Sequence, residues 1–109
     1  MIDGVRKDLI VAEEHELARA REQFGEAYHS HHEAYGVLAE ELYEVDREKE
    51  WIKFYTGDLL RALHLNTDDA TQMALENLRG AALRAACELV QVAAVCRKAM
   101  PDQEACSDA

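Results

Sequence analysis

The stretch "AACELVQVAAVC", residues 85–96, decides the fold of this chain because it is apolar on almost every side. Only Glu88 and Gln91 interrupt it, and extending the stretch back to Gly80 adds one more polar side chain, Arg84. Residues three or four apart share one face of a helix, so these three polar side chains lie on a narrow line. A helix this apolar must be covered by other helices or by a second subunit. We therefore expect the line Arg84–Glu88–Gln91 to face inward, where polar groups need partners.

The composition favours one small all-α domain. The chain has 109 residues, of which 49% are hydrophobic, with one proline and five glycines. This length suits a single domain, and the many Ala, Leu, Glu and Arg residues favour helices. We predict a compact helical bundle of three to five helices over residues 1–100, followed by a flexible tail over residues 101–109. Because so short a chain has few helices to surround residues 81–96, we also predict a homo-oligomer, a dimer or a tetramer.

Two helices are expected in the first half of the chain. The first runs from about Asp3 into the low twenties, where the helical pattern breaks around Gly25. The second begins after Ser30, because Ser30 followed three residues later by Glu33 forms a capping box. Its apolar residues recur at helical spacing to about Phe54.

The second half is predicted to hold a short helical piece and one long helix. Gly57 suggests an interruption, with a short helical piece at Leu59–Leu63. Asn66 or Thr67 then supplies a fresh N-cap, with acidic residues in the following turn. The last helix is expected to run from about Asp68 to Ala99.

The charge and the cysteines narrow the class of protein. The formal net charge is −10, from 22 acidic and 12 basic residues, which argues against binding to nucleic acid or to an anionic membrane. No window of about 20 residues is free of charge, so we expect no membrane span. The three cysteines form no CxxC pair and no secretory signal is visible, which predicts reduced thiols in a cytoplasmic protein. Of the three, Cys87 is expected to be a small core residue.

Glutamates on the second helix are candidate partners for the polar line. At 100° per residue, Glu41 lies at the edge of the apolar stripe centred on Leu38, Glu44 lies just beyond that edge, and Glu40 points well away. Packed against the last helix, Glu41 and Glu44 could meet Glu88 and Gln91. Carboxylates that converge in a partly dry space repel one another, so either some are protonated or a cation joins them. Oxygen ligands of this kind suit Mg²⁺ or Mn²⁺.

Two alternatives need no metal. The glutamates of the second helix could form a solvated surface together with Arg47 and Lys49. Glu88 could form an intrahelical ion pair with Arg84, its neighbour at i−4. The spacing alone leaves these alternatives open, because such patterns have a high false-positive rate.

The stretch "SHHEAYGVLAEELYEV", residues 30–45, resembles the signature of MazG-like, all-α nucleoside triphosphate pyrophosphohydrolases. It is most similar to a short subgroup whose second helix reads approximately S-x-H-E-x-Y-x-V-L-x-E-E-x-x-E-[LV]. The stretch "CELVQVAAV", residues 87–95, is similar to the E-x-x-Q-V-A-A segment of the same subgroup. Together the two blocks cover roughly 25 residues, in the expected order and helical context.

The resemblance implies a function and a set of site residues. It implies an enzyme that splits a nucleoside triphosphate into a monophosphate and pyrophosphate with the help of Mg²⁺. On this reading Glu41, Glu44 and Glu88 hold the metal, with Gln91 as a weaker fourth ligand. Glu40 would support these ligands or orient the attacking water. Phosphate oxygens would meet basic residues, for which the candidates are Lys53, Arg84 and Arg97.

The chain departs from the broader family in two ways. Gln91 stands where the broader family has Asp, which removes one anionic ligand. The 43 residues at positions 45–87 exceed the usual separation of the two blocks. This excess implies an extended helix or an inserted helical piece around Trp51–Leu65. Both departures support a rival hypothesis, a catalytically weak or inactive helical module that binds nucleotides or another protein.

Overall fold

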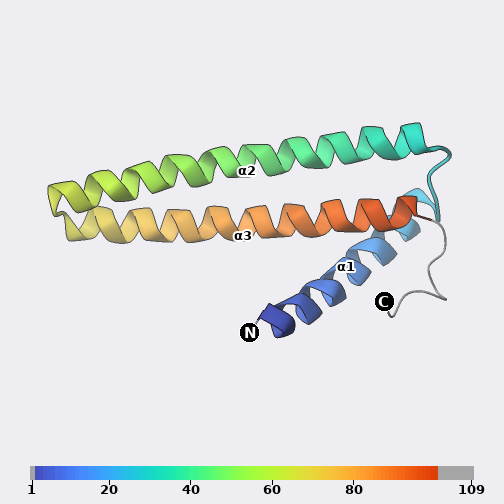
Figure 1. Ribbon diagram of the computed structural model, residues 1–109, viewed down its shortest axis with the longest axis horizontal. Helices are drawn as coiled ribbons and strands as arrows, with labels where there is room; N and C mark the ends of the chain where they lie inside the picture. Colours follow the sequence, from blue (N-terminus) through green and yellow to red (C-terminus); the bar gives the residue numbers. More distant parts are fainter. Residues whose placement is uncertain (1, 101–109) are drawn as a thin grey trace. The chain divides into compact units, whose positions relative to one another are not determined.

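The protein is all-α over residues 2–100, the part of the chain that the computed structural model describes. Three helices occupy this part, α1 (Ile2–Phe24), α2 (His31–Leu65) and α3 (Asp68–Ala99), and it contains no strand (Figure 1). The predicted fold class is confirmed, with a helix number inside the expected range. The predicted tail, residues 101–109, lies outside the described residues.

The helices contribute to two compact units. The first unit consists of α1 with the N-terminal part of α2, to Glu41, and the C-terminal part of α3, from Val90. The second unit, residues 42–89, is a hairpin in which the remaining parts of α2 and α3 run antiparallel (Figure 1).

The start of α2 is fixed by the predicted cap. The backbone N–H of Glu33 donates to Oγ of Ser30 at 3.1 Å, and the His29 N–H donates to Oε1 of Glu33 at 2.7 Å. These two bonds are the capping interaction read from the sequence, with the glutamate reaching one residue further back than Ser30. Just upstream, α1 ends at Phe24 and is followed by Gly25, whose φ of 100° is readily available to glycine.

The end of α2 differs from the prediction, because Gly57 does not interrupt the helix. α2 continues to Leu65 as one helix of 35 residues. A glycine inside a helix costs only about 1 kcal/mol relative to alanine, which the packing of neighbouring turns can outweigh. Those turns include Tyr55 and Leu59, which are half-buried, and Ala62, which is buried. Of the two possibilities drawn from the long separation between the sequence blocks, the extended helix is the one observed.

The reversal between α2 and α3 uses only Asn66 and Thr67. Asn66 has a φ of 56° and donates its N–H to the Leu63 carbonyl at 3.1 Å. The Thr67 N–H donates to the Ala62 carbonyl at 3.1 Å, which completes a Schellman motif. Thr67 then precedes α3, which spans the predicted residues Asp68–Ala99.

The buried positions are occupied mainly by alanine. In the second unit a seam of small side chains joins the two helices: Val45, Ala62, Ala74, Ala81 and Ala85. Ala81 is fully buried, and no large side chain within residues 2–100 is. Small side chains allow the two helix backbones to approach closely, but each of them removes little apolar area from water.

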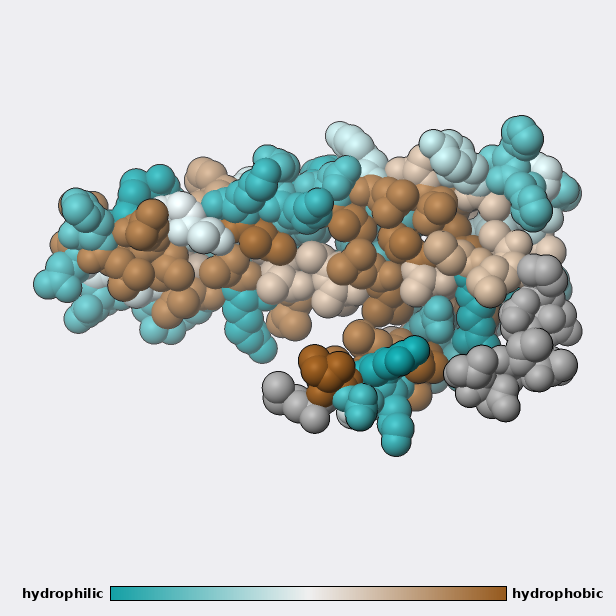
Figure 2. Space-filling model, viewed as in Figure 1, coloured by the Kyte–Doolittle hydropathy of each residue, from teal (hydrophilic) through white to brown (hydrophobic). Residues whose placement is uncertain are grey.

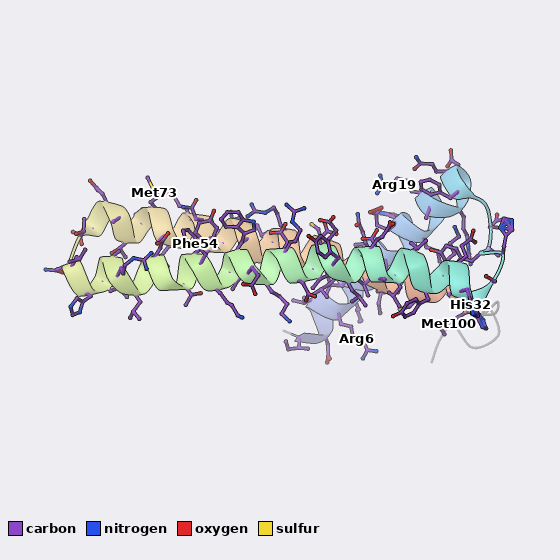
Figure 3. The ribbon with its side chains drawn as sticks, turned by 90° about the horizontal axis from the view of Figure 1, so that it is seen from above. Arg6, Arg19, His32, Phe54, Met73 and Met100 are labelled. Atoms are coloured by element: carbon purple, nitrogen blue, oxygen red, sulfur yellow. The ribbon has the colours of Figure 1, made fainter. Side chains whose placement is uncertain are left out.

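Large apolar side chains remain exposed on the hairpin of the second unit. Figure 2 shows hydrophobic side chains gathered on this hairpin among polar ones. Phe54 and Met73, labelled in Figure 3, are 54% and 63% exposed. Cys87 is also exposed, so its predicted place in the core is wrong, since the seam passes along the other side of α3 at Ala81 and Ala85. No helix within residues 2–100 is both long enough and apolar enough to span a membrane.

The helix reversal yields a stability prediction. Alanine has a Cβ but lacks the side-chain amide that helps Asn to adopt the left-handed conformation. We therefore expect Asn66→Ala to lower the free energy of unfolding by about 1 kcal/mol. Asn66→Gly should leave that free energy unchanged or raise it, because glycine adopts this conformation freely. Urea unfolding monitored by circular dichroism measures both. Equal losses in the two variants would show that the Asn66 side chain, and not its backbone conformation, stabilises the turn.

Candidate functional site

The candidate metal ligands are divided between the two units. Glu41 and Gln91 belong to the first unit, whereas Glu44 and Glu88 belong to the second. All four residues have intermediate exposure. For Glu41 and Glu44 this agrees with the predicted position at or just beyond the edge of the apolar stripe, and Glu88 and Gln91 are only partly turned inward.

In the second unit, carboxylates from both helices approach one another. Glu44 and Glu48 project from α2 and Glu88 from α3, and all three residues are half-buried. Burial raises the pKa of the Glu88 carboxyl, and the nearby charges of Glu44 and Glu48 raise it further. A raised pKa means that the ionised form of Glu88 is disfavoured where it stands. This raised pKa agrees with the prediction that Glu88 faces Glu44 on α2.

Arg84 does not follow the predicted line. Its side chain is 54% exposed, and its Nε donates to Oε1 of Glu48 across the hairpin at 3.1 Å. The expectation that Arg84 points inward together with Glu88 and Gln91 is wrong. Its long, strongly solvated side chain reaches along the surface of the hairpin to a carboxylate at the edge of the seam.

The three basic residues predicted to bind substrate all have acidic partners. Arg97 lies 3.5 Å from the Glu13 carboxylate on α1. Arg84 pairs with Glu48, and Lys53 lies 3.4 Å from the Glu50 carboxylate, one turn away on α2. The Lys53 pair is exposed to solvent and worth little. Lys53 could therefore exchange its partner for a phosphate group at small cost.

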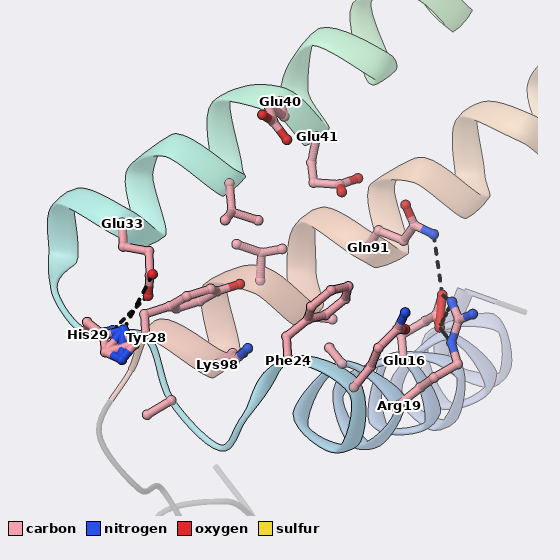
Figure 4. A pocket seen from close by; sticks show the side chains of 16 residues that line it. Glu16, Arg19, Phe24, Tyr28, His29, Glu33, Glu40, Glu41, Gln91 and Lys98 are labelled. Atoms are coloured by element: carbon pink, nitrogen blue, oxygen red, sulfur yellow. Dashed lines mark hydrogen bonds and ion pairs between the residues drawn. The ribbon is translucent and has the colours of Figure 1, made fainter.

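A cavity of about 550 Å³ lies within the first unit, and this volume is typical of small-molecule sites (Figure 4). Its walls come from α1, from the connection between α1 and α2, and from the parts of α2 and α3 in this unit. The apolar wall residues are Ala20, Phe24, Ala27, Val37, Ala94 and Val95. The polar ones include Glu16, Tyr28, Glu40, Glu41, Gln91 and Lys98.

Two predicted site residues on α2 line this cavity. Glu41 is half-buried, whereas Glu40 is exposed, in agreement with its predicted direction away from the apolar stripe. Burial raises the pKa of the Tyr28 hydroxyl, and the carboxylates of Glu33 and Glu41 raise it further. Tyr28 therefore stays protonated and can donate a hydrogen bond inside the cavity.

Gln91, the other predicted ligand in this unit, contacts α1. Its side-chain amide donates to Oε1 of Glu16 at 3.3 Å. Glu16 also accepts from Arg19 at 2.6–2.9 Å, and this bond is the main cause of its lowered pKa. The amide of Gln91 thus links α3 to an ion pair on α1, and its carbonyl oxygen is the atom that could serve a cation.

The sequence interpretation missed Lys98 and Tyr28. Lys98 is buried, and its Nζ lies 4.3 Å from the centroid of the Tyr28 ring. Seven residues separate Lys98 from Gln91, so the two share a face of α3. That spacing is a signal in the sequence, but a lysine in the last turn of a helix usually interacts with the helix dipole, so the spacing alone does not indicate a buried site.

Within residues 2–100, no three His, Cys, Asp or Glu side chains stand together in an arrangement that could hold a metal ion. The carboxylates of Glu44 and Glu48 lie near enough to Glu88 to raise its pKa without forming such a group. Comparisons with protein-family models, with curated proteins and with solved structures found no significant match.

The raised pKa of Glu88 predicts a pH dependence of stability. A carboxyl whose pKa is raised by folding contributes stability that is fully present below the unfolded value, about 4.5, and is lost as the pH rises through the folded pKa. Wild-type protein should therefore lose stability, relative to Glu88→Gln, as the pH rises from about 4 to 7. Thermal melts of the two proteins across this range measure the difference. A constant difference in melting temperature would contradict the repulsion of Glu88 by its neighbours.

Proposed function

We propose that this protein is a Mg²⁺-dependent nucleoside triphosphate pyrophosphohydrolase that releases a nucleoside monophosphate and pyrophosphate. The observation that supports it most is the environment of Glu88, a half-buried carboxyl whose pKa is raised by burial and by Glu44 and Glu48. A divalent cation relieves such repulsion. The proposed reaction is the one implied by the resemblance of residues 30–45 and 87–95 to MazG-like enzymes.

The proposed ligands are Glu41, Glu44 and Glu88, with the carbonyl oxygen of Gln91 as a weaker fourth. The donor chemistry suits Mg²⁺, with Mn²⁺ as an alternative, because both prefer oxygen ligands. Mg²⁺ is often held by one or two carboxylates, while water and substrate phosphates fill its other positions. The pair Glu44 and Glu88 suits a Mg²⁺ ion with few protein ligands better than one whose ligands all come from the protein.

The other site residues then have roles that follow from their surroundings. Bound Mg²⁺ would lower the pKa of a coordinated water and neutralise charge on the departing pyrophosphate. Glu40, exposed at the cavity, would orient the attacking water. Lys53 and Arg84 would turn from Glu50 and Glu48 to phosphate oxygens when the substrate binds. The three cysteines without a CxxC pair and the net charge of −10 favour a cytoplasmic enzyme that binds no nucleic acid.

A second candidate is a helical module that binds a nucleotide or another protein without efficient catalysis. Gln91 in place of an acidic residue favours it, as does the absence of a three-ligand cluster within residues 2–100. Such a module would keep the cavity of the first unit and lose the chemistry.

We further propose that the chain assembles as a homo-oligomer, a dimer or a tetramer. The second unit contains only two helices, and its buried residues form a thin seam of mostly alanine. The two helices leave many large apolar side chains exposed: Leu42, Trp51, Phe54, Leu60, Leu63, Leu65, Met73, Leu75, Leu83 and Leu89. A second copy of the hairpin would cover such a surface as a four-helix bundle does. The partner in this proposal is another copy of the same chain.

The enzymatic proposal predicts pyrophosphate release from at least one nucleoside triphosphate in the presence of Mg²⁺. Glu88→Gln keeps the side-chain shape but removes a ligand charge, so we expect its turnover to fall by about a hundredfold or more. Mg²⁺ at a hundredfold excess over its Kd should stabilise the wild type by about 2.7 kcal/mol, and Glu88→Gln should lose this gain. The assay is pyrophosphate release across a nucleotide panel, together with melting curves with and without Mg²⁺.

Glu76→Gln is the matched control, because Glu76 is an exposed residue of the same helix. It should behave as wild type in both measurements. Nucleotide binding without turnover in folded, Mg²⁺-loaded protein would favour the second candidate. Absence of any Mg²⁺ effect on wild-type melting would contradict the metal site.

The assembly proposal predicts a solution mass of two or four chains of 12.3 kDa by light scattering. Phe54→Glu places a charge on the apolar surface of the second unit and should shift the mass towards that of one chain. Gln72→Glu adds the same charge at an exposed polar position on α3 and should leave the oligomer intact. A wild-type protein that remains monomeric at high concentration would refute the proposal.

A further inference from the structure

Lys98 is the one buried charged residue within residues 2–100. It is 5% exposed, although lysine is almost never fully buried without a partner. Taking an ammonium group out of water is unfavourable unless other charges or dipoles compensate for it. The groups around Lys98 therefore indicate which kind of ligand would pair with its charge.

Two features compensate for this charge in part. Nζ of Lys98 lies 4.3 Å from the centroid of the Tyr28 ring, whose π face attracts cations. Lys98 also lies in the last turn of α3, where the helix dipole favours positive charge. Among the described residues, however, no carboxylate forms an ion pair with Lys98. Glu16 is bonded to Arg19, and Glu33 to His29.

The ammonium group belongs to the wall of the 550 Å³ cavity in the first unit. Figure 4 shows the Lys98 side chain pointing into the space beside Tyr28 and Phe24. Phe24 is 73% exposed, an unusual position for a phenylalanine, and its ring borders the same cavity. Val37 and Ala94 add apolar wall from α2 and α3. Among residues 2–100, the cavity thus combines a buried lysine that forms no ion pair with aromatic and aliphatic surfaces.

We propose that this cavity is a binding site for a small organic anion. A carboxylate or phosphate group of the ligand pairs with Lys98, and a flat or apolar body packs against Phe24, Tyr28 and Val37. The carboxylates of Glu40 and Glu41 on α2 repel the anionic end and so orient the ligand with its charge towards α3. This site requires neither a metal ion nor the carboxylates of the second unit. It shares Glu40 and Glu41 with the proposed hydrolysis, but its binding of an anion can be tested without Mg²⁺ and without nucleotide.

The test is a titration of the isotopically labelled full chain, observed by NMR in EDTA and without nucleotide. The probes are benzoate, phenyl phosphate and the uncharged benzyl alcohol. We expect at least one anion to shift the amide signals around Tyr28 and Lys98, with an affinity about tenfold or more above that of benzyl alcohol. The stronger of the two anions identifies the carboxylate or the phosphate as the preferred group.

Lys98→Met keeps the length and the buried apolar stem, so the chain should fold, and it should bind the anion about tenfold more weakly or worse. Lys98→Arg should retain binding, and Lys49→Met, at an exposed lysine of α2, should bind as wild type. Three results would each overturn the proposal: no binding of either anion at about 10 mM, equal binding of benzyl alcohol, or unchanged binding by Lys98→Met. None of these results bears on Mg²⁺-dependent hydrolysis, so the two proposals fail independently.

Discussion

The close contact between helices lined with alanine is the constraint on which the rest of this structure depends. Ala62, Ala74, Ala81 and Ala85 occupy most of the buried positions in the second unit, and Ala34 and Ala94 are buried in the first. Small side chains let helix backbones approach closely, but they bury little apolar area. Most large apolar side chains consequently remain outside the contact. A surface that covered those side chains would add further stabilisation by removing their apolar area from water.

The same constraint decides where the polar residues of the candidate site lie. A narrow line of alanines leaves room at its edges for longer side chains that are partly dry and partly solvated. Glu44, Glu48 and Glu88 occupy such edges in the second unit, and this position is why burial and mutual repulsion both act on Glu88. With larger core residues in the line, Glu88 would be more exposed to water, and burial would raise its pKa less.

The sequence predicted those features that depend on local interactions. The limits of α3 and the cap at Ser30 follow from side chains that bond to backbone groups a few residues away. Gly57 misled the prediction because its cost is small compared with the packing of a long helix, and that packing is not visible in a local pattern. The surface positions of Arg84 and Cys87 were likewise missed, since an all-round apolar helix does not reveal which side another helix will cover.

The candidate site shows the same division between local and long-range information. Helical spacing placed Glu41 and Glu44 at or just beyond the edge of an apolar stripe and predicted that Glu88 and Gln91 face inward, and all four are partly buried. The cavity at Lys98 could not be predicted in this way, because three helices and a connection meet there. Phe24 is the last residue of α1 and Tyr28 lies in the segment after it, and no periodicity links them to α3.

The two-residue reversal at Asn66 and Thr67 has a consequence for the way the chain folds. Ala62 and Ala74 lie a few residues on either side of the reversal, so joining the first turns of the hairpin closes only a short loop. Each further pair of helical turns can then pack next to a pair already in contact. The hydrogen bond between Arg84 and Glu48, which are 36 positions apart, forms late in this order. Such a hairpin closes outward from its tip, with a low contact order and a fast folding rate. α1 joins α3 through contacts across most of the chain, such as that of Glu13 with Arg97, 84 positions apart, so its docking is the slower event.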